Sequence, residues 1–176
     1  MMESCAILGH SPNHFYCGWN EESQICNRIK QMITDNIISL INDGVTEFNV
    51  VGDPGIGLWS AEILTDFQKT NSNIEINIME PYKRHTSSWP KMLKERYESL
   101  FNKCQNVFCC SGYRTKTALL KAYFDIIEES DMVLVVYESE SEYVDIVDSA
   151  ICFAERLGSS IILIHTSTFE IEKINI

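Results

Sequence analysis

Residues 47–62 read EFNVVGDPGIGLWSAE, an apolar run that passes through a turn with three glycines into a second apolar segment. A strand that enters such a turn and then a helix presents backbone N–H groups and the positive end of the helix dipole to an anion. Glycine also lets the backbone approach a ligand closely, because it carries no Cβ atom. We therefore interpret Gly52, Asp53, Gly55 and Gly57 as a cradle for a phosphate or a nucleotide. In the alternative interpretation, the glycines serve only the geometry of a strand-to-helix connection.

Apolar runs of strand length alternate with amphipathic segments along the whole chain. This alternation predicts a parallel sheet with helices on both sides and right-handed crossovers. We expect a Rossmann-like three-layer α/β/α fold, with a mainly parallel sheet of about six strands, in a single domain of residues 1–176. The expected strands are Cys5–Leu8, the run that ends at Val51, Ile74–Ile78, Val107–Cys110, Met132–Tyr137 and Ile161–Ile164. The expected helices begin at Glu21–Glu22, Leu58, Pro90, Thr117 and Tyr143, and the tail after Thr166 is left undecided.

The composition is that of a soluble globular protein of 176 residues. Its formal net charge of -11 argues against general nucleic-acid binding, because contacts with phosphates dominate that affinity. No apolar run reaches membrane-spanning length and the first residues lack the pattern of a secretory signal, so we expect a cytoplasmic protein without a membrane partner. The seven cysteines show no CxxC spacing, and a disulfide framework is not expected. A homo-oligomer is compatible with these properties.

Positive charge is concentrated in one part of this acidic chain. Residues 82–121 carry nine of the 14 Lys and Arg residues, but two of the 25 Asp and Glu residues. A basic region in an acidic protein suits a small anionic ligand, while the acidic remainder discourages polyanions. A solvated helix face would produce part of the same pattern.

Polar and aromatic residues follow the ends of several expected strands. In a parallel sheet these ends share one edge, which is where open α/β sheets bind their ligands. The cations would neutralise phosphate charge, and a base could stack on an aromatic ring, although core packing accounts equally well for Trp89. The candidate ligand-binding residues are Gly9, His10 and Ser11 after the first strand, Tyr82, Lys83 and Arg84 after the third, Trp89 beside the next helix, and Arg114 after the fourth strand.

His10, His14 and Cys17 have a spacing that would suit a metal site on a helix. Pro12 breaks such a helix and no fourth ligand is evident, so we expect neither a metal nor another cofactor. His10 is instead expected to contact the ligand beside Gly9.

Four short motifs occur in order along the chain. They are CAILGHSP at residues 5–12, the glycine turn that ends in LWSAE at residues 58–62, Trp89 with Tyr97, and Ser130-Asp131 before the strand that ends at Tyr137. Together they resemble the SLOG superfamily, the Rossmann-like fold shared by DprA and the LOG phosphoribohydrolases, and specifically its YpsA-like branch. The resemblance runs from about Cys5 to His165. It implies a site for nucleotides or nucleotide-derived ligands, which some members use for catalysis and others for sensing, including a cyclic ADP-ribose signal in bacterial defence against phage.

The chain also departs from this family pattern. Gly57 stands where the YpsA-like pattern usually has an acid, and Ser11 stands where arginine is common. An asparagine is usual near Tyr123, and residues 138–142 (ESESE) replace a second glycine-rich loop. These departures weaken the case for catalysis and indicate an altered ligand.

Three functions are compatible with these observations. The first is a binding module that senses or sequesters a nucleotide-derived small molecule, such as a cyclic nucleotide or an ADP-ribose-type signal. The alternative is a LOG-like nucleotide phosphoribohydrolase. In that case Asp53 would be the catalytic residue, because hydrolysis of an N-glycosidic bond needs a carboxylate. A further alternative is a protein-interaction module whose pocket has decayed.

Overall fold

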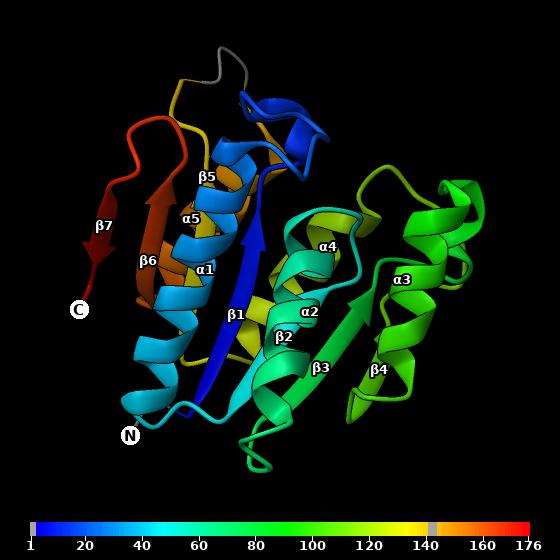
Figure 1. Cartoon of the computed structure of the whole chain (residues 1–176), viewed down its shortest axis with the longest axis horizontal. Coiled ribbons are helices and arrows are strands. Elements are labelled where there is room, and N and C mark those ends of the chain that lie inside the picture. Colours follow the sequence, from blue (N-terminus) through cyan, green and yellow to red (C-terminus); the bar gives the residue numbers. More distant parts are fainter. Residues whose placement is uncertain (1–2, 141–143) are drawn as a thin grey trace.

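The computed structural model describes residues 3–140 and 144–176, in which seven strands form one sheet (Figure 1). The strand order is β4-β3-β2-β1-β5-β6-β7, and all neighbours are parallel except β7, which is antiparallel to β6. The expected mainly parallel sheet is confirmed, and the undecided tail supplies the seventh strand. The strands are β1 Ser4–Gly9, β2 Glu47–Val51, β3 Glu75–Glu80, β4 Asn106–Cys109, β5 Met132–Tyr137, β6 Ser160–His165 and β7 Ile171–Ile174.

Helices cover both faces of the sheet and complete the expected three layers (Figure 1). One hydrophobic core lies between the sheet and α1, α2 and α3, and a second lies between the sheet and α4 and α5. The helices are α1 Gln24–Asn42, α2 Ile56–Gln68, α3 Lys91–Phe101, α4 Ala118–Glu128 and α5 Ile146–Leu157, with short 3-10 helices η1 Pro12–His14 and η2 His85–Ser88. Among the described residues, no helix combines the length and the apolar character needed to cross a membrane.

The direction in which successive strands are added to the sheet reverses between β1 and β5. From β1 it runs outward through β2 and β3 to β4, with α1, α2 and α3 on one face. It then returns to β5, which lies beside β1, and the remaining helices cover the other face. The loops that follow β1 and β5 therefore part to opposite faces, and they leave a crevice at the position where open α/β sheets bind ligands.

Helix α5 begins at Ile146 because Asp145 caps it. The Asp145 carboxylate accepts hydrogen bonds from the Ile146 amide and from the Asp148 amide. The Asp148 carboxylate in turn accepts one from the Asp145 amide, which completes a capping box. Tyr143, the expected first residue of this helix, lies outside the described residues. The cap fixes the Asp145 side chain at the carboxyl edge of the sheet.

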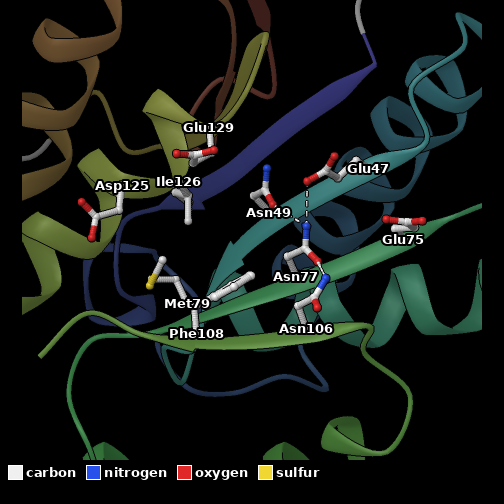
Figure 2. Close-up of a pocket in the computed structure, with 10 residues that line it drawn as sticks. All are labelled: Glu47, Asn49, Glu75, Asn77, Met79, Asn106, Phe108, Asp125, Ile126 and Glu129. Carbon is white, nitrogen blue, oxygen red and sulfur yellow. Dashed lines mark hydrogen bonds between the residues drawn. The ribbon is translucent and has the colours of Figure 1, made fainter. Parts of the chain in front are cut away.

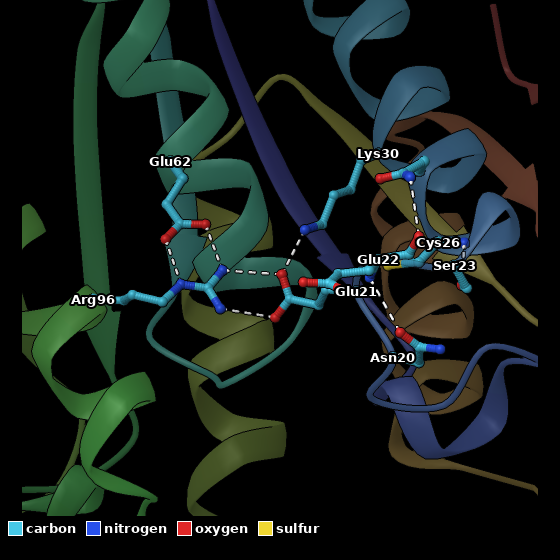
Figure 3. A network of polar contacts seen from close by, with 9 residues as sticks. Asn20, Glu21, Glu22, Ser23, Cys26, Lys30, Glu62 and Arg96 are labelled. Carbon is cyan, nitrogen blue, oxygen red and sulfur yellow. Dashed lines mark hydrogen bonds and ion pairs between the residues drawn. The ribbon is translucent and has the colours of Figure 1, made fainter.

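An ionic network holds the layer of α1, α2 and α3 together (Figure 3). Arg96 on α3 donates two hydrogen bonds of 2.8 Å to Glu62 on α2, and two of 2.8 and 3.1 Å to Glu21. Lys30 on α1 forms an ion pair with the same Glu21. Glu21 was expected to open α1, but Ser23 caps that helix and leaves the Glu21 carboxylate available to the network. The segment before α1 is thereby fixed against α2 and α3.

The pKa of Glu21 makes this network sensitive to acid. Burial alone would raise that pKa, but hydrogen bonds from Arg96 and Lys30 outweigh it and lower the pKa from 4.5 to about 2. A carboxyl group with a lowered pKa in the folded state stabilises the fold above its unfolded pKa, and this stabilisation is lost as pH falls through the folded pKa.

We therefore expect Glu21→Gln to lower the free energy of unfolding at pH 7 by roughly 1–2 kcal/mol, because charge-assisted hydrogen bonds are lost. The variant should also show a shallower loss of stability between about pH 4.5 and pH 2. Urea unfolding across this pH range measures both effects. Glu95→Gln is the matched control, since Glu95 is 61% exposed and pairs with Lys91 on the same helix. Identical pH profiles for Glu21→Gln and the wild type would contradict the role of the network.

Candidate functional site

A cavity of about 230 Å³, here called the central cavity, lies in the crevice at the carboxyl ends of β1 and β2. Ser11, Asp53 and Asp145 line it and come from the loops after β1 and β2 and from the N-terminus of α5. Gly9, Pro12, Pro54, Gly55, Leu119, Tyr123, Ile146 and Val147 complete its walls. Of the candidates expected from the sequence, Gly9, Ser11, Asp53 and Gly55 are brought together here.

Asp53 organises the turn between β2 and α2. Its Oδ1 atom accepts a hydrogen bond of 2.9 Å from the Gly57 amide, and its backbone carbonyl accepts one of 3.2 Å from the Leu58 amide. Burial raises the pKa of the Asp53 carboxyl group to about 7, although hydrogen bonds from the turn amides oppose this shift. A carboxyl group with this pKa is more readily protonated near neutral pH than an ordinary aspartate.

The glycines of the site are required by close packing within the protein. A Cβ atom on Gly57 would lie 1.9 Å from the carbonyl oxygen of Val51 and 2.1 Å from Asp53 Oδ1. The sequence led us to expect an open turn whose amides bind a phosphate. In the structure the Gly57 amide donates its hydrogen bond to Asp53 instead, so the Asp53 carboxylate lies at the start of α2, where the phosphate was expected. The other glycines are enclosed in the same way. A Cβ atom on Gly52 would lie 2.4 Å from Tyr97 Oη, and one on Gly55 would lie 2.6 Å from Pro12 Cδ. A Cβ atom on Gly9 would lie 2.6 Å from the carbonyl oxygen of Val136.

Gly57→Ala is expected to lower the free energy of unfolding by roughly 1–3 kcal/mol or more, because backbone atoms of β2 must move to admit the methyl group. Chemical denaturation of the purified variant measures this change. Gly112→Ala is the matched control, since a Cβ atom there meets no atom within 4 Å, and it should change stability by no more than about 0.5 kcal/mol. Equal stability of the two variants would contradict the packing role of Gly57.

His10 is fully buried and is not among the residues that line the central cavity. The direct ligand contact expected of it stays a prediction. The Nδ1 atom of His10 accepts a hydrogen bond of 2.8 Å from the Glu138 amide, which places the proton of the neutral ring on Nε2. Burial lowers the pKa of His10 and favours this neutral form. Within the described residues Nε2 has no hydrogen-bond partner and lies 4.0 Å from Asp145 Oδ2. His14 Nε2 contacts the same Asp145 oxygen at 3.0 Å, so His14 is the ring that fixes the Asp145 side chain.

A second hollow of about 490 Å³, here called the basic hollow, shares Leu119 with the central cavity. Tyr82, Arg114 and Lys116 line it, and both cations are exposed to solvent. Tyr82 and Arg114 were expected at this edge, whereas Lys116 was not. The expected cations Lys83 and Arg84 are exposed and line neither cavity.

Asp145 and Tyr123 were not expected at the site. Asp145 follows β5 and precedes the apolar spacing of α5, with Asp148 three residues later, so a capping-box search would have placed it at the carboxyl edge. Tyr123 is buried on α4, where its hydroxyl donates a hydrogen bond of 3.4 Å to the Gly9 carbonyl. No sequence signal marks Tyr123, because its role depends on how α4 packs against β1.

A different cavity, of about 390 Å³, lies on the sheet face beside α4 (Figure 2). Asn106, Asn77 and Asn49 lie in register on β4, β3 and β2, and each side-chain amide donates a hydrogen bond of 2.9 Å to the next oxygen, ending at the Ser130 hydroxyl. The charged residues in its lining are all acidic, namely Glu47, Glu75, Asp125 and Glu129. This asparagine cavity therefore disfavours an anionic ligand.

The parallel sheet and the crevice at its reversal point define a Rossmann-like α/β protein. The YpsA family model, described as the YspA SLOG family, matches residues 5–168, and the chain belongs to this family. UPF0398 proteins of Staphylococcus aureus strains JH9, JH1 and Mu3 are each 26% identical to this chain over 116 residues. The match covers 65% of this chain and 62% of each relative, so the chain spans less than two thirds of their length. The expected membership of the YpsA-like branch is confirmed.

Proposed function

We propose that this protein binds a nucleotide-derived small molecule across the central cavity and the basic hollow, and that it senses or sequesters this molecule in the cytoplasm. The observation that carries the proposal is that the central cavity, lined by two carboxylates, and the basic hollow, lined by two cations, share Leu119. Membership of the SLOG family supports the general class of ligand.

The central cavity suits the sugar of such a ligand. Asp53 and Asp145 offer carboxylate oxygens, and Ser11 offers a hydroxyl group. Carboxylates accept hydrogen bonds from ribose hydroxyl groups, whereas they repel a phosphate. His14, whose Nε2 atom lies 3.0 Å from Asp145 Oδ2, holds this acceptor in place and is a positioning residue.

The basic hollow suits the phosphate. Arg114 can form a bidentate pair with phosphate oxygens, and Lys116 adds a second positive charge. The central cavity is smaller than the roughly 300–1,000 Å³ of typical small-molecule sites, but with the basic hollow it reaches that range. A ligand that combines a sugar with one or more phosphates uses both parts, which supports a cyclic nucleotide or an ADP-ribose-type signal of the kind used in defence against phage.

Calorimetry of the full chain with AMP, cyclic nucleotides and ADP-ribose tests this proposal. Arg114→Ala should weaken binding of the preferred ligand by roughly 10-fold to 100-fold, because a hydrogen bond to a charged group contributes about 1.5–3 kcal/mol. Lys91→Ala is the matched control, since Lys91 is 88% exposed on α3 and lines neither cavity, and it should leave the affinity unchanged. No binding by any member of the panel at millimolar concentration would contradict the proposal and favour a protein-interaction module.

A second candidate function, hydrolysis of an N-glycosidic bond, is favoured by one observation. The pKa of Asp53 is raised to about 7 beside the central cavity, which is the range in which a carboxyl group acts as a general acid or base. The chain would then be a nucleotide phosphoribohydrolase of the LOG type, with Asp53 as the catalytic residue.

Asp53→Asn tests this candidate, because asparagine keeps an oxygen acceptor for the Gly57 amide but does not ionise. Release of ribose 5-phosphate from AMP by the wild type, and its loss by about 100-fold or more in the variant, would support hydrolysis. The fold control is the stability profile. Because the pKa of Asp53 is raised in the folded state, the free energy of unfolding of the wild type is highest below about pH 4 and falls as pH rises through about 7. Asparagine does not ionise, so the variant should lack this fall in stability. No release by the wild type would contradict the hydrolase and leave binding as the function.

A further inference from the structure

We propose that an apolar cavity beside the site, here called the aromatic cavity, holds the base of the ligand. This cavity has a volume of about 410 Å³, and Trp19, Trp89 and Met92 are among its lining residues. The ligand is then a nucleotide that carries its aromatic base, and not a sugar phosphate alone. This inference rests on the proposed function, because it assigns a neighbouring cavity to the same molecule.

The position of the aromatic cavity follows from Pro54, which lines both this cavity and the central cavity. Pro54 belongs to the turn that Asp53 and Gly57 fix by their hydrogen bond. The central cavity thus shares Pro54 with the aromatic cavity and Leu119 with the basic hollow. A ligand with its sugar beside Asp53 reaches the cations past Leu119 and the indole rings past Pro54, so the three cavities match a phosphate, a sugar and a base.

The side chains of the aromatic cavity have the chemistry that stacks on a base. Two indole rings and the Met92 thioether line it, and Trp19 and Met92 remain 42% and 72% exposed. Every base has a flat π face, and its stacking on an aromatic side chain contributes about 1–3 kcal/mol. Methionine adds a polarisable surface that adapts to a ring.

Both indole rings are oriented before a ligand binds. Trp19 Nε1 donates a hydrogen bond of 2.6 Å to Asn13 Oδ1. Trp89 packs edge to face against His85 and Tyr97, with ring centroids at 5.3 and 5.4 Å. Groups held in place in the free protein lose less entropy on binding, so the cavity is organised for a planar partner.

The charges at the aromatic cavity are balanced. Arg96 and Glu21 lie in its lining, but both belong to the ionic network of two cations and two carboxylates (Figure 3). The guanidinium group already donates to Glu21 and Glu62 through Nε and both Nη atoms. The cavity therefore has no unbalanced positive charge to attract a phosphate, and a neutral aromatic group suits it better.

The test is calorimetry of the full chain with AMP and with ribose 5-phosphate, which share the sugar and the phosphate and differ by the base. The wild type should bind AMP about 5-fold to 150-fold more tightly, which is the stacking range expressed as affinity. Trp19→Ala should remove this preference without changing the affinity for ribose 5-phosphate, and Trp19→Phe should keep part of it. Phe108→Ala is the matched control, because this half-exposed aromatic residue lines the asparagine cavity instead and its loss should keep the preference.

The outcomes separate this inference from the proposed function. Equal affinity of the wild type for AMP and ribose 5-phosphate would overturn the base assignment, leave the sugar and phosphate assignment standing, and favour a protein side chain as the occupant. Binding of neither compound would overturn the proposed function itself. Equal weakening of both ligands by Trp19→Ala would show that Trp19 only supports its loop, and this too would overturn the inference.

Discussion

The hydrogen bond between the Asp53 carboxylate and the Gly57 amide is the constraint on which the rest of the site depends. It places an internal carboxylate at the start of α2, where the amides and the helix dipole stabilise negative charge. Burial acts in the opposite direction, and the balance leaves the pKa of Asp53 at about 7. Because the turn is fixed in this way, Pro54 is fixed between the central cavity and the aromatic cavity. In the proposed mode of binding, the phosphate lies instead beside Arg114 and Lys116, on the loop before α4.

The asparagine cavity, the aromatic cavity and the basic hollow differ in the charge of the residues around them, and each therefore favours a different ligand group. The asparagine cavity is rimmed by acids, and the ionic network beside the aromatic cavity is balanced (Figures 2 and 3). Exposed cations line the basic hollow, within a chain whose formal net charge is -11. An acidic protein with a local basic site attracts a small anion and repels a polyanion, because the surrounding field acts over a longer range than the local contacts.

The architecture could be predicted from the sequence because its signals are local. The apolar run Met132–Tyr137 and the glycine-bounded helices identify strands and helices without knowledge of their neighbours. The roles of Gly52 and Gly55 could not be predicted, since the atoms that exclude a side chain there come from distant segments, namely Tyr97 and Pro12. Tyr123 was missed for the same reason. Lys83 and Arg84 follow the correct strand, but side-chain direction in a loop depends on backbone conformation, and Arg84 adopts a left-handed one (φ 61°).

The central claim is that the ligand occupies the carboxyl edge of the sheet, between the loop after β1 and the N-terminus of α5. A titration of the ¹⁵N-labelled protein with AMP, followed by two-dimensional NMR, tests this claim most directly. The account predicts that the largest shifts fall on the amides of Ser11, Asp53, Asp145 and Arg114. Shifts confined to Asn49, Asn77 and Asn106 would place the ligand in the asparagine cavity and contradict the account.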